Sequence, residues 1–251
     1  MRIAVISDIH GNFFALDVIL TDIEQEAIDQ IVCLGDAIQG GPQPAQTVRR
    51  LRELHCPIVM GNADAWLLTG RNTSLHEQIT ESQLATRMWS LAQLSEDDLA
   101  WIGRFQPTVE LDLEAGKKLL CFHGSPHSFD DILLPDTPEE EFQRLLGGFD
   151  VALMTGGHTH TQQLRRLGDA WYFNPGSVGL AYNWRLPDDQ FHADPWAEYA
   201  IVTAQERRIG LEFRHVPFDV DELIQLIRAS GKPDAKQALG MYQRTDTHEK
   251  R

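Results

Sequence analysis

The stretch that decides the fold reads RIAVISDIHGNFFALDVILTDIEQEAIDQIVCLGD and covers residues 2–36. A short apolar run is followed by a polar turn and by residues 13–27, whose apolar side chains recur at helical spacing. Asn12 stands where a helix N-cap belongs. After IVCLGD come a Gly/Pro turn, a helical stretch over 45–55 and the apolar run PIVM at 57–60. This alternation predicts parallel βαβ units, whose strands are buried on both faces.

Downstream of this region the periodicity changes twice. The pattern over residues 64–104 is helical, and we interpret it as a helical insertion. From Val109 onward, runs of period two joined by short turns predict strand pairs, one of which turns at Ala115-Gly116. We therefore expect a single α/β domain over residues 1–231, followed by a polar tail over 232–251 that frays.

The composition is that of an ordinary globular protein, with 42% hydrophobic and 24% charged residues. The net charge of -15, from 22 basic and 37 acidic residues, disfavours a role in coating nucleic acid. No apolar run reaches the ~20 residues that span a bilayer, so no membrane association is expected. Three scattered cysteines fit a reducing compartment, and the opening MRIAVISD is unlike a signal peptide. We expect a cytoplasmic protein.

Polar side chains that can ligate metals follow five of the expected strands. They are Asp8, His10, Asp36, Asn62, His123, His158 and His160. The carboxyl ends of strands are where open α/β sheets bind their ligands. In an extended chain residues i and i+2 point to the same side, so Asp8 can converge with His10, and His158 with His160.

Two carboxylates, one amide oxygen and four imidazoles are enough ligands for two metal ions. A mixed oxygen and nitrogen set without thiolate suits Mn, Fe, Zn, Co or Ni better than Ca or Mg. Taken one at a time, Asp and Asn after a strand are explained by turns, and the histidines by ordinary core or loop positions. The ordered set of seven favours two divalent transition-metal ions, with Mn the first choice.

The same residues carry a family resemblance. The blocks DIHGN, GDAIQGGP, GNAD, FHGSP and GGHTH, in this order, resemble those of the calcineurin-like metallophosphoesterase superfamily over about residues 1–178. The stretch NPGSVGLA resembles a block of its small bacterial phosphodiesterase-like branch. The resemblance implies a four-layer αββα sandwich of two mixed β-sheets with flanking helices, in agreement with the α/β pattern above. It also implies a hydrolase that acts on a small phosphorylated substrate.

The resemblance further implies an assignment of ligands. One metal would be bound by Asp8, His10, Asp36 and His160, and the other by Asp36, Asn62, His123 and His158, with Asp36 bridging. It implies catalytic roles for Asp36, Asn62 and His123. Two metals ~3.5–4 Å apart lower the pKa of a bridging water, so that a metal-bridging hydroxide attacks phosphorus.

One block departs from the family pattern. Residues 61–64 are Gly-Asn-Ala-Asp, whereas many members carry at the position of Ala63 a histidine that is thought to assist the leaving group. Alanine cannot donate a proton, so we expect substrates with good leaving groups, such as aryl esters or nucleotide phosphoanhydrides. His127 is a candidate substitute, although a solvated loop histidine is the simpler interpretation. Asp64 either caps the following helix, which we favour, or orders water near the site.

Substrate contacts are expected from Asn62 and His127 and from the NPGSVG turn. In that turn, Asn174 and Ser177 either shape the floor of the site or hydrogen-bond a phosphate oxygen. Arg185 is the next guanidinium along the chain, and a solvated loop arginine is again the simpler interpretation.

The leading hypothesis is metal-dependent hydrolysis of phosphodiesters or nucleotide-type substrates. The enzymatic alternative is a protein-phosphatase-like or dinucleoside-polyphosphate hydrolase, against which the missing histidine at Ala63 argues. The alternative of another class is a metal-binding scaffold for protein partners. All seven ligand positions are filled, which argues against the scaffold because clustered polar groups persist where something uses them.

Overall fold

The computed structural model describes residues 1–71, 78–187, 190–206 and 208–242, and their strands form two mixed β-sheets. The first sheet has the order β2-β1-β8-β9, with β1 (Arg2–Ile6), β2 (Gln30–Cys33), β8 (Trp196–Gln205) and β9 (Arg208–Pro217). The second has the order β3-β4-β5-β7-β6, with β3 (Val109–Asp112), β4 (Lys118–Cys121), β5 (Leu153–Thr155), β6 (Gln163–Leu167) and β7 (Ala170–Asn174). The expectation of two mixed sheets is confirmed.

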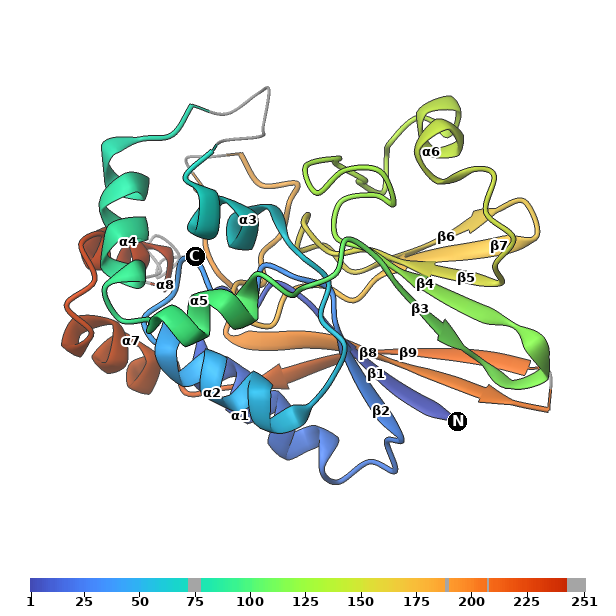
Figure 1. Ribbon diagram of the computed structural model, residues 1–251, viewed down its shortest axis with the longest axis horizontal. Helices are drawn as coiled ribbons and strands as arrows, with labels where there is room; N and C mark the ends of the chain where they lie inside the picture. The colour runs from blue at the N-terminus through green and yellow to red at the C-terminus, as the bar shows by residue number, and fades with distance from the viewer. Residues whose placement is uncertain (72–77, 188–189, 207, 243–251) are drawn as a thin grey trace, which may run out of the picture.

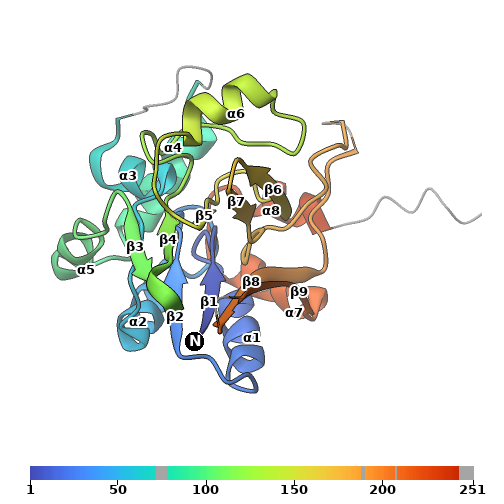
Figure 2. The ribbon, with the colours of Figure 1, turned by 90° about the vertical axis from the view of Figure 1, so that its right-hand side faces the viewer.

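Helices cover the outer face of each sheet. Figure 2 shows the two sheets face to face, with helical cover above the second sheet and beneath the first. The upper helix is α6 (Glu139–Leu146), and the lower ones are α1 (Phe13–Ile23), α2 (Pro44–Leu54) and α7 (Val220–Ala229). The layers therefore run helix, sheet, sheet, helix, as the αββα expectation requires.

Each of the three interfaces between layers has its own apolar cluster. Ile19 and Val48 belong to the cluster between the lower helices and the first sheet. Val5 and Leu119 belong to the cluster between the sheets, and Phe142 to the cluster under α6. Because the hydrophobic effect scales with buried apolar area, these three interfaces supply most of the stabilisation of the fold.

The predicted strand pairs and the predicted N-cap at Asn12 are present in the structure. Strands β1 and β2 pair in parallel, and the Asn12 side chain accepts a hydrogen bond from the Ala15 N–H at the start of α1. Strands β3 and β4 pair antiparallel across a turn in which Ala115 has φ 61°. The pairs β6–β7 and β8–β9 are likewise antiparallel, so the predicted strand pairs are confirmed.

The helical insertion folds as three helices, α3 (Asn62–Thr69), α4 (Glu81–Leu91) and α5 (Glu96–Ile102). Thr80 and Ser95 form capping boxes at the starts of α4 and α5, which fix where those helices begin. The expected start of the middle helix lies near His76, outside the described residues. Leu67 and Ile102 are fully buried in the cluster beneath the first sheet, so the insertion packs against the body of the molecule (Figure 1).

Two expectations are corrected by the structure. The run at 57–60 is not a full strand, because Ile58 bridges to Cys33 on one side while Val59 bridges to Gln106 on the other. The expected fraying of the tail is wrong for part of it: α8 (Ala235–Tyr242) is a helix that packs against α7. Its last turn is held by the Met241 carbonyl, which accepts the Ala193 N–H at 2.8 Å. Residues 243–251 lie outside the described residues.

No helix in the described part of the chain combines the length and the apolar character that a membrane crossing requires.

Candidate metal centre

The expected ligands meet where loops from both sheets converge. Six of the seven form two groups of three, in each of which one ligand atom per residue lies within 4.8 Å of the others. The first group is Asp8, His10 and His160, and the second is Asp36, His123 and His158. Side chains more than 100 residues apart in the chain are thus brought together as the sequence predicts, while metal ligation itself stays a prediction.

The backbone at this site is strained. Eight non-glycine residues in the described chain have a positive φ, and five of them are Asp8, His10, Asp36, His158 and His160. Such conformations are costly for residues with a Cβ and persist only where the surrounding structure enforces them. Their concentration at the candidate ligands makes this cluster the candidate functional site.

Hydrogen bonds between the loops enforce that conformation. The Asp8 N–H donates to the Gly35 carbonyl at 3.0 Å, and the His10 N–H donates to the Asp36 carbonyl at 2.8 Å. Gly61 allows close approach, because a Cβ at this position would lie 2.1 Å from Asp36 Oδ1. The strand-end loops are therefore interlocked, and the ligands are held in place before anything binds.

The imidazole orientations indicate which ring nitrogens carry protons. Nδ1 of His10 lies 2.9 Å from the Gln39 carbonyl, Nδ1 of His123 lies 2.8 Å from the Leu34 carbonyl, and Nδ1 of His160 lies 2.7 Å from the Leu180 carbonyl. A carbonyl only accepts, so each Nδ1 must donate. Each Nε2 then presents a lone pair in the neutral ring, which is the arrangement of a metal-binding histidine.

Those lone pairs have no protein donor to satisfy them. Nε2 of His10 and Nε2 of His160 lie 3.0 Å apart, a contact that needs a shared proton or a cation. Asp8 Oδ1 is buried without a hydrogen-bond partner and lies 3.4 Å from the same His160 Nε2. The other carboxylate oxygen, Oδ2, accepts the His158 N–H at 3.1 Å. An unpaired buried oxygen facing two lone pairs is what a cation site requires.

Asp36 lies between the two groups. Its Oδ2 is 3.8 Å from His10 Nε2 in the first group and 3.4 Å from His123 Nε2 in the second. Its Oδ1 accepts the Ala63 N–H at 2.8 Å, which fixes the carboxylate. Asn62, the seventh expected ligand, places Oδ1 3.0 Å from His123 Nε2 and so joins the second group.

Burial and mutual charge shift the titration of the cluster. Burial favours the neutral acids, yet the neighbouring histidines outweigh it and hold the pKa of Asp8 and of Asp36 below its ordinary value. Burial lowers the pKa of His158 to about 4. For His123, burial is outweighed by the Asp36 carboxylate, which raises the pKa to about 9. At His160 the Asp8 carboxylate likewise outweighs burial and raises the pKa of the imidazole.

The NPGSVG turn shapes the floor of the site. Asn174 is fully buried, and its amide donates to the Gly157 carbonyl at 2.7 Å and to Thr159 Oγ1 at 3.1 Å. Ser177, also fully buried, donates from Oγ to the Asp8 carbonyl at 2.9 Å. Asn174 and Ser177 therefore use these polar atoms to hold neighbouring loops. This supports the expectation that they shape the floor of the site and disfavours the expectation that they hydrogen-bond a phosphate oxygen.

Other expected participants lie elsewhere. His127 is exposed, and its ring packs 5.7 Å from that of Phe149; no described contact joins its side chain to the cluster. Arg185 is exposed and lies over the ring of Trp184, which agrees with the interpretation of a solvated loop arginine. Asp64 is not a helix cap: it lies within the first turn of α3, whose N-cap is Gly61.

Asp64 anchors the Asp36 loop instead. Its fully buried carboxylate accepts the Ala37 N–H at 2.9 Å and the Ile38 N–H at 3.0 Å. The prediction that Asp64 caps the following helix was wrong. Its carboxylate instead accepts hydrogen bonds from a loop that is 26 residues away in the sequence, and the residues next to Asp64 carry no sign of that contact.

The sequence also gave no indication of Gln39, Leu34 and Leu180, whose carbonyls orient the three imidazoles. Every residue has a backbone carbonyl, so no residue-type signal distinguishes these positions.

Comparison with known proteins agrees with this geometry. A family model described as the calcineurin-like phosphoesterase superfamily domain matches residues 1–207. The chain belongs to the calcineurin-like phosphoesterase superfamily. Membership of this superfamily makes the chain a phosphoester hydrolase.

Relatives of this superfamily member cover most of its length. An uncharacterized protein of Methanocaldococcus jannaschii is 26% identical over 243 residues, which is 92% of this chain and 94% of that protein. Phosphodiesterase YfcE of Escherichia coli is 26% identical over 190 residues, covering 72% of this chain and 80% of its own.

Solved structures show the same calcineurin-like fold. A metallophosphoesterase from Sphaerobacter thermophilus superposes with a TM-score of 0.72 at 25% identity, covering 96% of this chain and 98% of that one. A hypothetical protein from Pyrococcus horikoshii superposes with a TM-score of 0.78 at 18% identity, covering 95% and 97%.

Proposed function

We propose that the chain is a divalent-metal-dependent phosphodiesterase. The metals would be held by the two groups of three described above, with Asn62 as a further ligand and Asp36 shared between them. The observation that supports this most strongly is the 3.0 Å contact between Nε2 of His10 and Nε2 of His160. Both rings donate from Nδ1 to carbonyls, so a cation resolves the contact without requiring a buried imidazolium. The mixed oxygen and nitrogen donor set without thiolate suits Mn, Fe, Zn, Co or Ni, and we choose Mn for the tests below.

Divalent ions bound there would supply hydroxide near neutral pH and neutralise charge that develops on the phosphoryl oxygens. The chain's own residues orient the reactants. Asp36 Oδ1 is occupied by the Ala63 N–H, so Oδ2 is the oxygen that faces both groups. Asn62 directs Oδ1 toward His123, which leaves its amide N–H free to donate to a phosphate oxygen.

The charge around the site favours a diester over a monoester. Among the described residues, no lysine or arginine forms a hydrogen bond or an ion pair with the six clustered side chains. A phosphodiester carries one negative charge, whereas a monoester carries up to two near neutrality and needs more positive charge. The relative in Escherichia coli that is named a phosphodiesterase supports the same choice.

The leaving group receives no proton from the position next to Asn62. Ala63 offers only its backbone N–H, and that group is bonded to Asp36. General acid help contributes typically ~10²–10⁴ to rate, so esters whose leaving group is already stable as an anion lose least. We therefore propose activated diesters, such as aryl esters, as the best substrates in vitro.

The experiment compares ester classes on one protein. The full chain is stripped of metal, reloaded with Mn²⁺ and assayed with bis(4-nitrophenyl) phosphate, 4-nitrophenyl phosphate and diadenosine tetraphosphate. We expect the diester to have the highest kcat/KM, and Asp36→Asn to lower it by at least ~100-fold. The matched control is Asp17→Asn, an exposed aspartate on α1, which is expected to retain wild-type activity.

Metal binding is measured independently. Elemental analysis is expected to find Mn retained by the wild type and reduced in Asp36→Asn. Mn²⁺ at ~100 times its Kd stabilises the folded state by about 2.7 kcal/mol, which raises Tm by roughly 5–10 °C in a chain of this size. Failure to take up metal, or to hydrolyse any of the three substrates when loaded, would refute the proposal. Preference for diadenosine tetraphosphate would favour the dinucleoside-polyphosphate alternative.

A further inference from the structure

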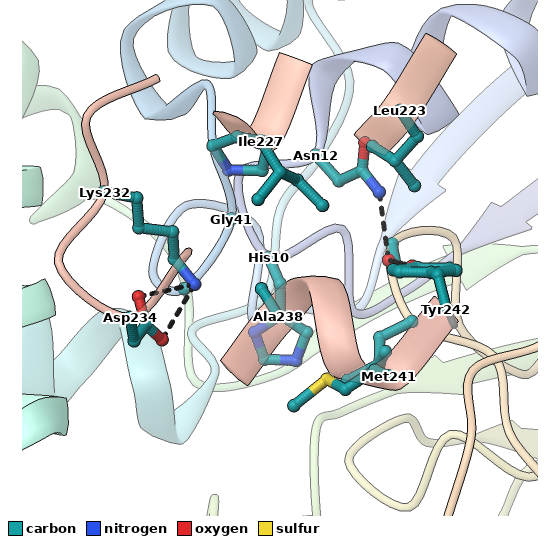
Figure 3. A pocket seen from close by; sticks show the side chains of 14 residues that line it. His10, Asn12, Gly41, Leu223, Ile227, Lys232, Asp234, Ala238, Met241 and Tyr242 are labelled. Carbon is teal, nitrogen blue, oxygen red and sulfur yellow. Dashed lines mark hydrogen bonds and ion pairs between the residues drawn. The ribbon is translucent and has the colours of Figure 1, made fainter. Parts of the chain in front are cut away.

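A second feature adjoins the candidate metal centre. A cavity of about 190 Å³ lies between the His10 and Gly41 loops on one side and helices α7 and α8 on the other. Leu223 and Ile227 of α7, and Ala238, Met241 and Tyr242 of α8, supply much of its apolar lining. Figure 3 shows the His10 ring among the lining side chains.

His10 belongs both to the wall of this cavity and to the candidate metal centre. Its Nε2 faces His160 at 3.0 Å, while the ring also forms part of the cavity wall. The His10 side chain remains 22% exposed, in contrast to the fully buried Asp8 beside it, so this edge of the centre is open. A group attached to a phosphate at the metal centre would reach the cavity past the His10 ring.

The helices that line the cavity lie outside the shared family domain. The family model ends at residue 207, before α7 and α8 begin. Their placement is nevertheless fixed. The Tyr242 hydroxyl donates to the Gly179 carbonyl at 3.5 Å, and the same carbonyl accepts the Asn12 amide at 3.0 Å. Gly179 in turn donates its N–H to the Asp8 carbonyl at 2.9 Å, so α8 is tied to a loop of the metal centre.

The described lining of the cavity offers no unpaired cation to an anionic group of a ligand other than the phosphate. Its one lysine, Lys232, is bonded to Asp234 at 2.9 Å and is almost fully buried, so its charge is already balanced (Figure 3). An apolar cavity of 150 Å³ is large enough to bind benzene. A pocket of about 190 Å³ thus fits one aromatic ring or a group of similar size.

We propose that this cavity binds the apolar organic group of the phosphoester while the phosphate occupies the metal centre. The inference rests on the proposed function and narrows it, because it makes esters of aromatic or similarly bulky apolar alcohols the preferred substrate class. It assigns that preference to α7 and α8, which the family domain does not include.

The test uses ligands that cannot be hydrolysed, so that binding is read without turnover. The full chain loaded with Mn²⁺ is titrated calorimetrically with methylphosphonate and with phenylphosphonate. Burial of the ring is expected to make phenylphosphonate bind about 10- to 100-fold more tightly. Ala238→Leu fills the cavity from α8 and is expected to reduce that ratio to less than about threefold, with methylphosphonate affinity unchanged.

Gln237→Leu is the matched control, since it adds the same side chain to an exposed position of the same helix and is expected to keep the wild-type ratio. If Ala238→Leu does not fold, Met241→Ala replaces it. This change enlarges the cavity and is expected to shift the preference from phenylphosphonate toward 1-naphthylphosphonate.

The outcomes separate the two proposals. Equal affinity for methyl- and phenylphosphonate in the wild type overturns the cavity assignment alone. So does a ratio that Ala238→Leu leaves unchanged, or, where Met241→Ala replaces that variant, an unchanged preference for phenylphosphonate over 1-naphthylphosphonate. Absence of binding by either phosphonate points to failure of the metal-centre proposal, and the cavity assignment falls with it.

Discussion

Replacement of Asn174 by alanine tests how the His158 loop is held. The Asn174 amide donates to the Gly157 carbonyl and to Thr159 Oγ1, which are the residues on either side of His158. Its Oδ1 accepts the Gly176 N–H at 2.8 Å. One buried side chain therefore fixes the loop that presents a candidate ligand.

The size of the effect follows from those contacts. Asn174→Ala leaves the Gly176 N–H buried without a partner, at about 1–3 kcal/mol, while the Gly157 carbonyl keeps the Thr159 N–H at 2.8 Å. This cost of about 1–3 kcal/mol corresponds to a fall in Tm of roughly 2–12 °C for a chain of this length. Residues that orient a metal ligand typically contribute about 10- to 100-fold in metal affinity, so the apparent Kd for Mn²⁺ is expected to rise by that factor.

The assay combines thermal unfolding of the metal-free protein with activity measured over a range of Mn²⁺ concentrations. Asn183→Ala is the matched control. Its Oδ1 accepts the N–H of the residue two positions later, Arg185, just as Asn174 Oδ1 accepts that of Gly176, but Asn183 is exposed. The control is expected to change stability by no more than about 0.5 kcal/mol. An unchanged Tm and Mn²⁺ affinity in Asn174→Ala, together with a raised KM for substrate, would instead show that Asn174 contacts the substrate.

Three further changes are expected to give defined results. His127→Ala should lower kcat by far less than the ~10²–10⁴ of a general acid, since this side chain is exposed beside Phe149; a loss of that size would restore His127 to the mechanism. Burial raises the pKa of Glu198 to about 7, so the folded carboxyl keeps a proton that the unfolded one loses above its ordinary 4.5. The free energy of unfolding of the wild type thus falls by up to about 3 kcal/mol as pH rises from 4.5 to about 7. The Tm of Glu198→Gln relative to that of the wild type should therefore be higher at pH 8 than at pH 5. A Tm difference that does not change with pH would contradict the raised pKa of Glu198. Ala115→Gly should raise Tm, because glycine relieves a positive φ worth about 1 kcal/mol, and a lower Tm would show that the turn is unstrained.

Much of the fold was predictable because its signals are local. The N-cap at Asn12 and the turn at Ala115 each act within a few residues, and the structure confirms both. The tail was less predictable. Its helix α8 has few buried residues of its own and depends on contacts with α7 and with the Gly179 loop.

The site divides in the same way. The sequence by itself determined which side chains gather, because Asp8, Asp36, His123 and His158 each stand directly after an apolar run that becomes a strand, and strand ends converge. Only the tertiary structure decided what those side chains do there: which nitrogen of each imidazole is free, and that Asp64 anchors a loop while Asn174 holds another. The ends of strands can be predicted from the sequence, because they follow from the local pattern of apolar residues. The proton positions and anchors depend on backbone groups brought close by folding, and every residue carries those groups alike.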